Sequence, residues 1–374
     1  MLKILYFSLI DWDFVYQRPQ QLAERLSLTN HFIYVQPFGL RNLRFSDIRR
    51  AFRRLQHLII GLDSEKGLDI RNFFFIPIAA SPFTKINSSL LRYQMSSLVD
   101  PETVIWVTYP SPLIAAILEG MKYRALIYEM MDDYPNIHPG LEEDIRHREG
   151  WFLSKADLVI TTSEALAEKA KKMREGVRIK LIRNGVDYHF FNHASKVRPL
   201  EFNGLEKIVG YVGTIHQWVD FDLIDYLADH RPDLNFVFIG PIRVRRLPLK
   251  KNIRFTGTID YGKVPAYCNG FDVCLIPFKQ GEFADTINPV KLYEYLALGK
   301  PVVSYYMREL ECYKDILYLA GNKRDFLEKV GIALDERDSG IRELRKDIAR
   351  RNDWTMISEV ISEELLRLIT ASNA

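Results

Sequence analysis

Cysteine is scarce in this chain of 374 residues, and Cys268, Cys274 and Cys312 form no C-x-x-C pair. The chain therefore has no disulfide framework, and its thiols are typical of a reducing compartment. No run of 18 apolar residues occurs, which argues against a membrane-spanning helix. The apolar start, MLKILYFSLI, runs into Asp11 and Asp13 without a small-residue cleavage site, so we interpret it as a strand rather than a signal peptide.

The chain also lacks a large excess of either positive or negative residues. The chain has 51 basic and 48 acidic residues, a net charge of +3, which excludes a polycation built to bind nucleic acid. Its composition, 47% apolar and 26% charged, excludes a disordered chain. The length fits two domains of roughly 150 residues. The basic excess is local, because residues 41–58 carry six arginines and one aspartate.

Short apolar runs alternate with helical patterns along both halves of the chain, as is typical of parallel sheets covered by helices. In the first half we expect strands at residues 2–9, 31–35, 73–77, 104–108, 125–129, 158–161 and 180–182. In the second half we expect strands at residues 207–212, 236–239, 253–256, 273–277 and 301–305. Residues 192–206 lose the alternation and are interpreted as a linker. The predicted fold class is α/β, with ligands bound at the carboxyl ends of the strands.

The stretch that says most about chemistry is residues 285–303, DTINPVKLYEYLALGKPVV. Asn288 is a good N-cap and Pro289 a good first residue, so a helix is predicted to begin here. Free N–H groups at a helix N-terminus favour an anion such as a diphosphate. Lys291 and Glu294 share one helix face, where the cation could meet phosphate and the carboxylate could accept hydrogen bonds from ribose hydroxyls. On spacing alone, an ordinary surface ion pair is the commoner explanation.

This stretch resembles the nucleotide-sugar signature of GT-B glycosyltransferases, especially the bacterial family 4-like enzymes of polysaccharide assembly. Further matching pieces stand in the expected order at residues 182–191 (IRNGVDYHFF), 209–224 (VGYVGTIHQWVDFDLI), 236–241 (FVFIGP) and 252–278. Residues 11–26 (DWDFVYQRPQQLAERL) and 128–134 resemble a subgroup that includes teichuronic-acid glycosyltransferase-like proteins. The resemblance covers almost the whole chain.

The resemblance implies the GT-B architecture of two Rossmann-like domains facing a cleft. Residues 1–195 would bind the acceptor, residues 205–350 would bind the nucleotide sugar, and residues 353–374 would form a helix crossing back to the first domain. Glu294 would be the second glutamate of an E-x7-E motif that holds the donor ribose, and Lys291 would meet the diphosphate. Gly213 and Thr214 would lie near the donor phosphates.

One departure from the family pattern concerns the donor sugar. The first glutamate of the motif would stand eight residues before Glu294, where this chain has Thr286 beside Asp285. Either Asp285 shifts into that role, or the donor sugar is held differently. His216 could hydrogen-bond a phosphate or a sugar hydroxyl, with Trp218 stacking beside it, although both could equally be packing residues. The expected donor-binding set is Gly213, Thr214, His216, Asp285, Asn288, Lys291 and Glu294.

Acidic residues follow strands predicted in the first half. Asp132 and Asp133 come after residues 125–129, and repulsion between their carboxylates would raise one pKa toward a value suited to general-base catalysis. The alternative is a turn or helix cap. Asp13 and Arg18 could line the acceptor site, although a solvated side chain in a first helical turn explains Arg18 equally well.

The arginine-rich stretch has a helical period, with apolar residues at alternating steps of three and four. A basic amphipathic helix is typical of proteins on an anionic membrane surface. An ordinary helix that covers a sheet is the alternative. The expected location is the cytoplasm, with a peripheral position on the inner face of the cell membrane. The expected membrane-contact residues are Arg49, Arg50, Arg53 and Arg54.

The function predicted from these features is the transfer of a sugar from a nucleoside diphosphate, UDP foremost, to a hydroxyl of a cell-surface polysaccharide or lipid-linked glycan precursor. Lys291, the helix N-terminus and loop amides would stabilise the leaving diphosphate, so neither a metal nor a cofactor is expected. Nucleic acid is not an expected partner. The alternatives are a catalytically inactive scaffold of a synthesis complex and a nucleotide-sugar 2-epimerase. A dehydrogenase is disfavoured, because no G-x-G-x-x-G follows the first strand.

Overall fold

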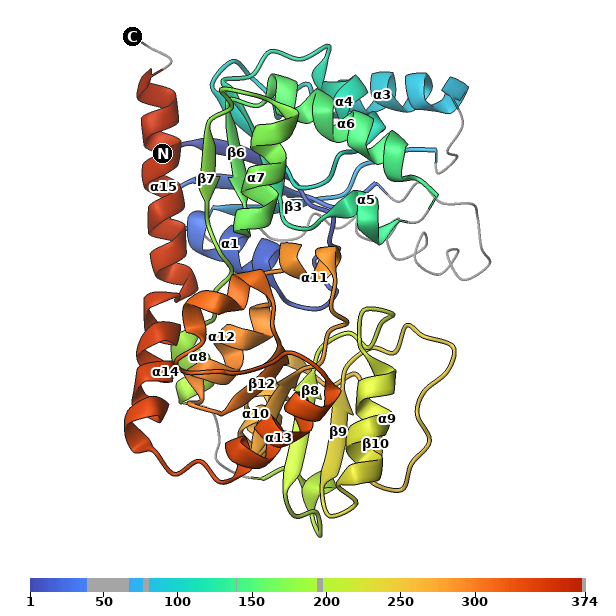
Figure 1. The fold of residues 1–374 in the computed structure, drawn as a ribbon. Coiled ribbons are helices and arrows are strands. Elements are labelled where there is room, and N and C mark those ends of the chain that lie inside the picture. The colour runs from blue at the N-terminus through green and yellow to red at the C-terminus, as the bar shows by residue number, and fades with distance from the viewer. Residues whose placement is uncertain (39–66, 77–80, 139, 194–197, 372–374) are drawn as a thin grey trace. The chain divides into compact units, whose positions relative to one another are not determined.

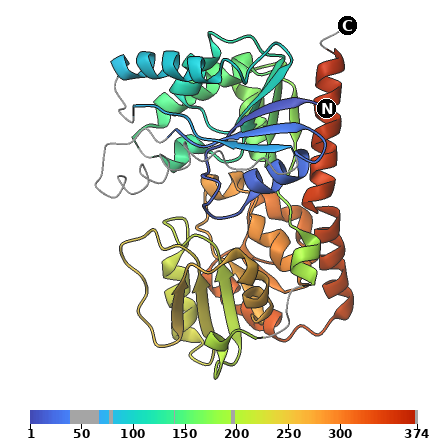
Figure 2. The same cartoon turned by 180° about the vertical axis from the view of Figure 1, so that it is seen from behind.

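The structure is a computed structural model that describes residues 1–38, 67–76, 81–138, 140–193 and 198–371. The chain divides into two compact units. Unit 1 comprises Met1–Ile182 together with Ser358–Ala374, and unit 2 comprises Arg183–Ile357. Figures 1 and 2 show the elements of both units from opposite sides.

Unit 1 is built on a parallel sheet that has seven strands within the described residues, in the order β3-β2-β1-β4-β5-β6-β7. β4 reads TVIWV and is buried at every position, as expected for a strand covered on both faces. The strand order reverses between β1 and β4, and ligand sites of such sheets lie at the carboxyl ends beside this point. The strands are β1 (Lys3–Phe7), β2 (His31–Val35), β3 (Leu68–Arg71), β4 (Thr103–Val107), β5 (Ala125–Met130), β6 (Leu158–Thr161) and β7 (Ile179–Leu181).

Helices cover both faces of this sheet. In Figures 1 and 2, α3, α4 and α6 lie together over one face and α1 lies on the other. Two helix starts follow directly from the sequence, because the Ser111 side chain accepts the Ile114 N–H and the Ser163 side chain accepts the Leu166 N–H. The helices are α1 (Arg18–Leu26), α3 (Ser81–Met95), α4 (Pro112–Leu118), α5 (Tyr134–Ile137), α6 (Glu142–Lys155) and α7 (Glu164–Met173).

The strand predicted at residues 73–77 is wrong. Residues 73–76 are extended but pair with no strand of the described part of the chain, and the neighbour of β2 is β3 instead. The Asn87 side chain hydrogen-bonds both backbone polar groups of Ile76. It accepts the Ile76 N–H at 2.7 Å and donates to the Ile76 carbonyl at 2.8 Å. Phe73 and Phe75 pack against the core, so the aromatic run marks burial rather than strand pairing.

Unit 2 is built on a second parallel sheet, with six strands among the described residues in the order β10-β9-β8-β11-β12-β13. α12 packs against α8 and α14, and α9 packs against α13. The strands are β8 (Ile208–Val212), β9 (Asn235–Ile239), β10 (Ile253–Gly257), β11 (Val273–Ile276), β12 (Val302–Tyr305) and β13 (Tyr318–Ala320). The helices are α8 (Tyr188–Asn192), α9 (Phe221–His230), α10 (Val264–Asn269), α11 (Glu282–Thr286), α12 (Val290–Ala297), α13 (Lys323–Leu334) and α14 (Ser339–Arg351).

The boundary between the units falls at Ile182, earlier than the predicted end of the first domain at residue 195. The segment interpreted as a linker is part of unit 2 where the structure describes it. Phe202 and Leu205 are buried in the core of unit 2, and α8 packs against α10 and α12. The linker interpretation is wrong because a few apolar side chains are enough to pack a segment against the core of unit 2, even where the segment has no helical or strand period.

The last helix, α15 (Trp354–Ala371), belongs to unit 1 from Ser358 onward. Its Glu364 carboxylate accepts hydrogen bonds from Lys180 Nζ at 2.9 Å and from Arg178 Nη2 at 3.1 Å. These two cations, Lys180 first, lower the pKa of Glu364. A depressed carboxylate pKa stabilises the folded state above the usual glutamate pKa, and that contribution is lost as the pH falls through the folded-state value.

We therefore expect Glu364→Gln to lower the free energy of unfolding at pH 7 by about 1–2 kcal/mol. The loss should shrink toward about pH 3, because the pH then falls through the lowered folded-state pKa and the wild-type carboxylate takes up its proton as well. Urea denaturation at both pH values measures the difference. Glu363→Gln is the control, since the Glu363 side chain is 67% exposed and pairs with Arg367 at the surface. Equal losses in both variants would contradict the prediction.

Candidate functional site

The predicted helix after β11 is α12, which begins at Val290 with Pro289 in the N-cap position. The prediction that Asn288 caps this helix is wrong. The Asn288 Oδ1 atom accepts the Asn184 N–H at 2.8 Å, and its Nδ2 atom donates to the Tyr293 hydroxyl at 3.1 Å. Asn184 donates in return to the Asn288 carbonyl at 2.7 Å. Buried Asn288 therefore fixes the entry to α12, and the first N–H groups of α12 receive no side-chain cap from Pro289.

Lys291 and Glu294 lie together on α12, with Lys291 Nζ 2.7 Å from Glu294 Oε2. The Glu294 side chain is 4% exposed, whereas the Lys291 side chain is 21% exposed. Burial raises the pKa of Glu294, and the neighbouring Lys291 opposes that rise. The commoner alternative, a surface ion pair, is therefore wrong for the carboxylate. A buried carboxylate that destabilises the fold and is matched by a single cation is a candidate for ligand binding.

α12 is joined to the end of β8, because the Tyr295 hydroxyl accepts the N–H of Val212, the last residue of that strand, at 2.9 Å. Gly213 is the next residue after Val212, and its backbone lies so close to Gly240 that position 240 has no room for a side chain. A Cβ on Gly240, whose φ is 140°, would lie 2.1 Å from the Gly213 carbonyl oxygen. The Thr214 carbonyl accepts the Tyr211 hydroxyl at 3.2 Å. Gly213 and Thr214 therefore follow the carboxyl end of β8, where the strand is bonded to α12.

His216 stacks on Trp218, with ring centroids 4.1 Å apart and planes 23° apart. The indole therefore has one face occupied by the imidazole, an arrangement that the sequence did not indicate. Burial, followed by the charge of Arg243, lowers the pKa of His216, so the ring is neutral near pH 7. Its Nδ1 atom is buried and has no hydrogen-bond partner among the described residues. His216 can therefore offer a neutral ring nitrogen to a polar group.

Asp285 and Thr286 occupy the region of the absent glutamate. The Asp285 Oδ1 atom accepts the Arg308 N–H at 3.0 Å, and the Thr286 hydroxyl donates to the Phe283 carbonyl at 2.7 Å. Thr286 is buried, and Asp285 is half-buried. One Asp285 oxygen is thus committed to the backbone of unit 2, which leaves the other as the group that could reach a sugar.

In unit 1 the two predicted acidic residues have different surroundings. Asp133 is buried, and its carboxylate meets Lys169 Nζ at 2.7 Å and Asn136 Nδ2 at 2.7 Å. No hydrogen bond or ion pair from the described residues reaches half-buried Asp132, and its pKa is raised to about 6, first by burial and then by the charge of Asp133. Repulsion is therefore the smaller cause of the shift. Asp132 alone retains a carboxylate suited to proton transfer.

Arg18 is neither solvated nor available to an acceptor in the way expected. It is 3% exposed, and its Nε atom donates to Glu129 Oε1 at 2.7 Å. Glu129 is fully buried and also accepts the Trp106 indole N–H at 2.9 Å. Glu129 was not among the residues predicted from sequence, although a glutamate inside the apolar run of β5, ALIYEM, was the available signal. Asp13 is exposed in the loop after β1.

The predicted membrane contact and the predicted absence of a metal are not tested by the structure. Arg49, Arg50, Arg53 and Arg54 lie outside the described residues, so the membrane contact stays a prediction from sequence. Among the residues that the structure describes, none of the helices is long and apolar enough to cross a membrane. The same residues contain no group of three or more His, Cys, Asp or Glu side chains that could hold a metal ion.

The fold and the site define a class of protein. Two parallel sheets, each with helices on its faces and a loop at the carboxyl strand ends, are the two Rossmann-like parts of the GT-B fold. Sucrose-phosphate synthase from Thermosynechococcus elongatus has a similar structure, with a TM-score of 0.73 at 14% identity over 99% of this chain and 100% of that one. Anabaena HepE, solved with UDP and glucose, has a TM-score of 0.67 at 16% identity over 98% and 99% of the two chains.

Sequence comparison indicates which activity accompanies this fold. Residues 206–336 match the family described as glycosyl transferases group 1. Over 312 residues the chain is 28% identical to a Bacillus subtilis (strain 168) protein assigned to teichuronic acid biosynthesis as the glycosyltransferase TuaH, which covers 74% of this chain and 77% of that protein. The chain is a glycosyltransferase with the GT-B fold, and it is similar to TuaH.

Proposed function

We propose that this glycosyltransferase transfers a sugar from a UDP-sugar to a hydroxyl of a cell-surface polysaccharide or of its lipid-linked precursor. The observation that carries the donor half of the proposal is the buried Glu294 carboxylate 2.7 Å from Lys291, on a helix that contacts the last residue of β8 through Tyr295. Support for UDP comes from HepE, which has the same fold and was solved with UDP and glucose. Support for the acceptor class comes from the name of the TuaH relative.

The groups around α12 suit a departing nucleoside diphosphate. Negative charge develops on the diphosphate as its bond to the sugar breaks, and the Lys291 ammonium and the uncapped N–H groups of α12 would stabilise that charge. The Glu294 carboxylate would accept hydrogen bonds from the ribose hydroxyls and so orient the donor. The neutral ring of His216 would hydrogen-bond a phosphate or sugar oxygen. Because these groups supply the compensating charge, we propose that the transfer needs no metal ion.

Asp132 is the group in unit 1 that would activate the acceptor. Its carboxylate has a pKa of about 6, so it is mostly deprotonated at pH 7 and can remove the proton of an attacking hydroxyl. This role belongs to a direct displacement that inverts the anomeric carbon. Asp133 and Lys169 hold the neighbouring backbone in place through their ion pair of 2.7 Å.

A panel of nucleotide sugars tests the proposed donor. We expect UDP and one or more UDP-sugars to raise the melting temperature of the protein in proportion to the logarithm of their concentration, whereas GDP and ADP derivatives should not. Release of radiolabelled sugar from the stabilising donor should then proceed equally with and without EDTA. Stabilisation by GDP-sugars or ADP-sugars alone would contradict the proposed donor, and loss of turnover in EDTA would contradict metal independence.

A further inference from the structure

Unit 1 has a hollow between α6 and α7 that the residues discussed so far do not explain. Its volume is about 440 Å³, within the usual range for small-ligand sites, and it is open to solvent. Three cationic side chains and one carboxylate line it. They are Arg146 on α6 and, on α7, Glu168, Lys169 and Lys172, with Ala165 and Met173 completing the wall.

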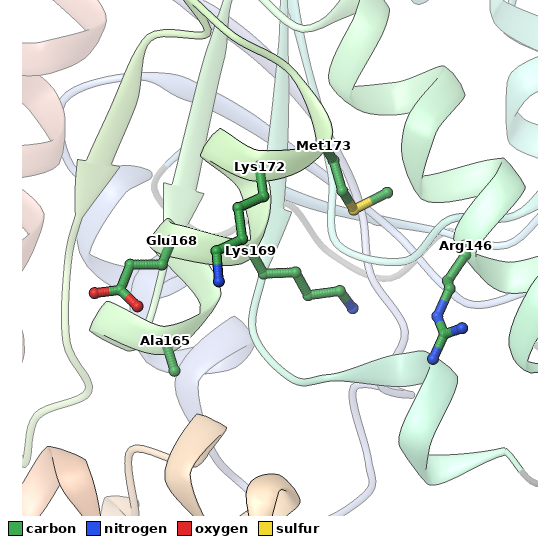
Figure 3. Close-up of a pocket in the computed structure, with 6 residues that line it drawn as sticks. All are labelled: Arg146, Ala165, Glu168, Lys169, Lys172 and Met173. Atoms are coloured by element: carbon green, nitrogen blue, oxygen red, sulfur yellow. The ribbon is translucent and has the colours of Figure 1, made fainter.

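The cationic side chains of this hollow differ in whether they form ion pairs. Figure 3 shows the Lys169 ammonium and the Arg146 guanidinium pointing toward the same space, while the Glu168 carboxylate points to the opposite side of α7. Arg146 and Lys172 are exposed, and no hydrogen bond or ion pair joins either of them to another described side chain. A concave surface with two exposed cations that form no direct ion pair attracts an anion.

Lys169 connects the hollow to the acidic segment after β5. Its Nζ atom lies 2.7 Å from Asp133 Oδ1 and 3.0 Å from the buried Glu149 carboxylate, yet its side chain is 22% exposed on the wall of the hollow. Asp133 is the chain neighbour of Asp132. A ligand bound beside Lys169 therefore lies next to the segment that carries the candidate base.

We propose that this hollow binds an anionic group of the acceptor, either a phosphate or a sugar carboxylate, through Arg146 and Lys172 with Lys169 at its inner wall. The inference rests on the proposed function, since it gives the acceptor of that reaction a negative charge. Guanidinium and ammonium groups both form charge-assisted hydrogen bonds with phosphate and carboxylate oxygens. The hydroxyl to be glycosylated would then be presented with its anionic group held by α6 and α7.

Titration calorimetry on the full chain tests the site with inorganic pyrophosphate, methyl glucuronide and neutral methyl glucoside, each in the presence of excess UDP to fill the donor site. We expect pyrophosphate or the glucuronide to bind and the glucoside not to bind. The double variant Arg146→Gln with Lys172→Gln should bind the anion about tenfold more weakly, because each cation contributes a partly exposed ionic contact. Lys169 stays unchanged, since its loss would leave buried Asp133 and Glu149 unpaired.

The control is Lys155→Gln with Lys171→Gln, which removes the same charge from exposed positions outside the hollow and should change the affinity less than about twofold. Binding of pyrophosphate alone identifies a phosphate on the acceptor, and binding of the glucuronide alone identifies a carboxylate. The inference is overturned if neither anion binds, if UDP abolishes anion binding, or if both double variants lose affinity equally. Failure of UDP itself to bind would refute the proposed donor and leave pyrophosphate binding at the hollow as a separate result.

Discussion

Glu294→Gln is expected to weaken UDP binding about 100-fold while leaving the protein as stable as the wild type or more so. The loss of affinity follows from two charge-assisted hydrogen bonds to the ribose hydroxyls, each worth roughly 1.5–3 kcal/mol when one partner is ionised. Glutamine keeps the shape of the side chain but offers a single neutral acceptor. A residue present only to pack α12 would not separate binding from stability in this way.

The expected gain in stability follows from the pKa of Glu294, which burial raises. A carboxyl group whose pKa is raised on folding binds its proton more tightly in the folded state, so the free energy of unfolding falls as the pH rises from the usual glutamate pKa through the folded-state value. Near pH 7 the ionised carboxylate therefore destabilises the fold, and the amide removes that cost. Lys291 loses its partner but remains 21% exposed to water.

Melting temperatures with and without UDP, at pH 5 and pH 7.5, measure both effects. The difference in stability between variant and wild type should grow toward the higher pH, and the melting-temperature shift at a given UDP concentration should be much smaller in the variant. Glu282→Gln is the matched control, because Glu282 is exposed on α11 and precedes the same helix. A normal UDP shift in Glu294→Gln would remove this carboxylate from the donor site.

Asp132→Asn is expected to lower kcat by roughly 10²–10⁴-fold with little change in UDP binding, the usual effect of removing a general base. In the wild type, kcat/KM should fall below about pH 6, because protonation of the carboxylate, whose pKa is about 6, removes the base. The variant should lack this acid limb. The rate should rise with pH in the wild type, since the deprotonated form is the active one.

A pH series of initial rates and the anomeric configuration of the product, read by NMR, test this role together. Glu175→Gln serves as control, because Glu175 is an exposed carboxylate that follows α7 in the same unit. A product that retains the donor configuration, with a rate for Asp132→Asn within about threefold of the wild type, would exclude Asp132 as the base. The acidic segment would then have a positioning role only.

Local features of the candidate site could be predicted from sequence because their partners lie within one helical turn or directly after one strand. Lys291 and Glu294 are three residues apart on one helix, so their common face follows from helix geometry. Asp132 follows an apolar strand, so its place at a carboxyl strand end follows from the alternation of strands and helices. Thr286 could be recognised as a departure, but its bond to the Phe283 carbonyl could not.

The sequence by itself determined that this chain is an α/β protein with two parallel sheets, because fully buried strands read as continuous apolar runs. Only the tertiary structure decided which polar groups remain for chemistry. Arg18 pairs with Glu129, 111 positions away, and Asn288 with Asn184, 104 positions away. Asp133 is committed to Lys169 while Asp132 stays without a partner among the described residues. Burial and pairing between distant segments set these outcomes, since the free-energy cost of an unpaired buried charge depends on neighbours that folding alone brings together.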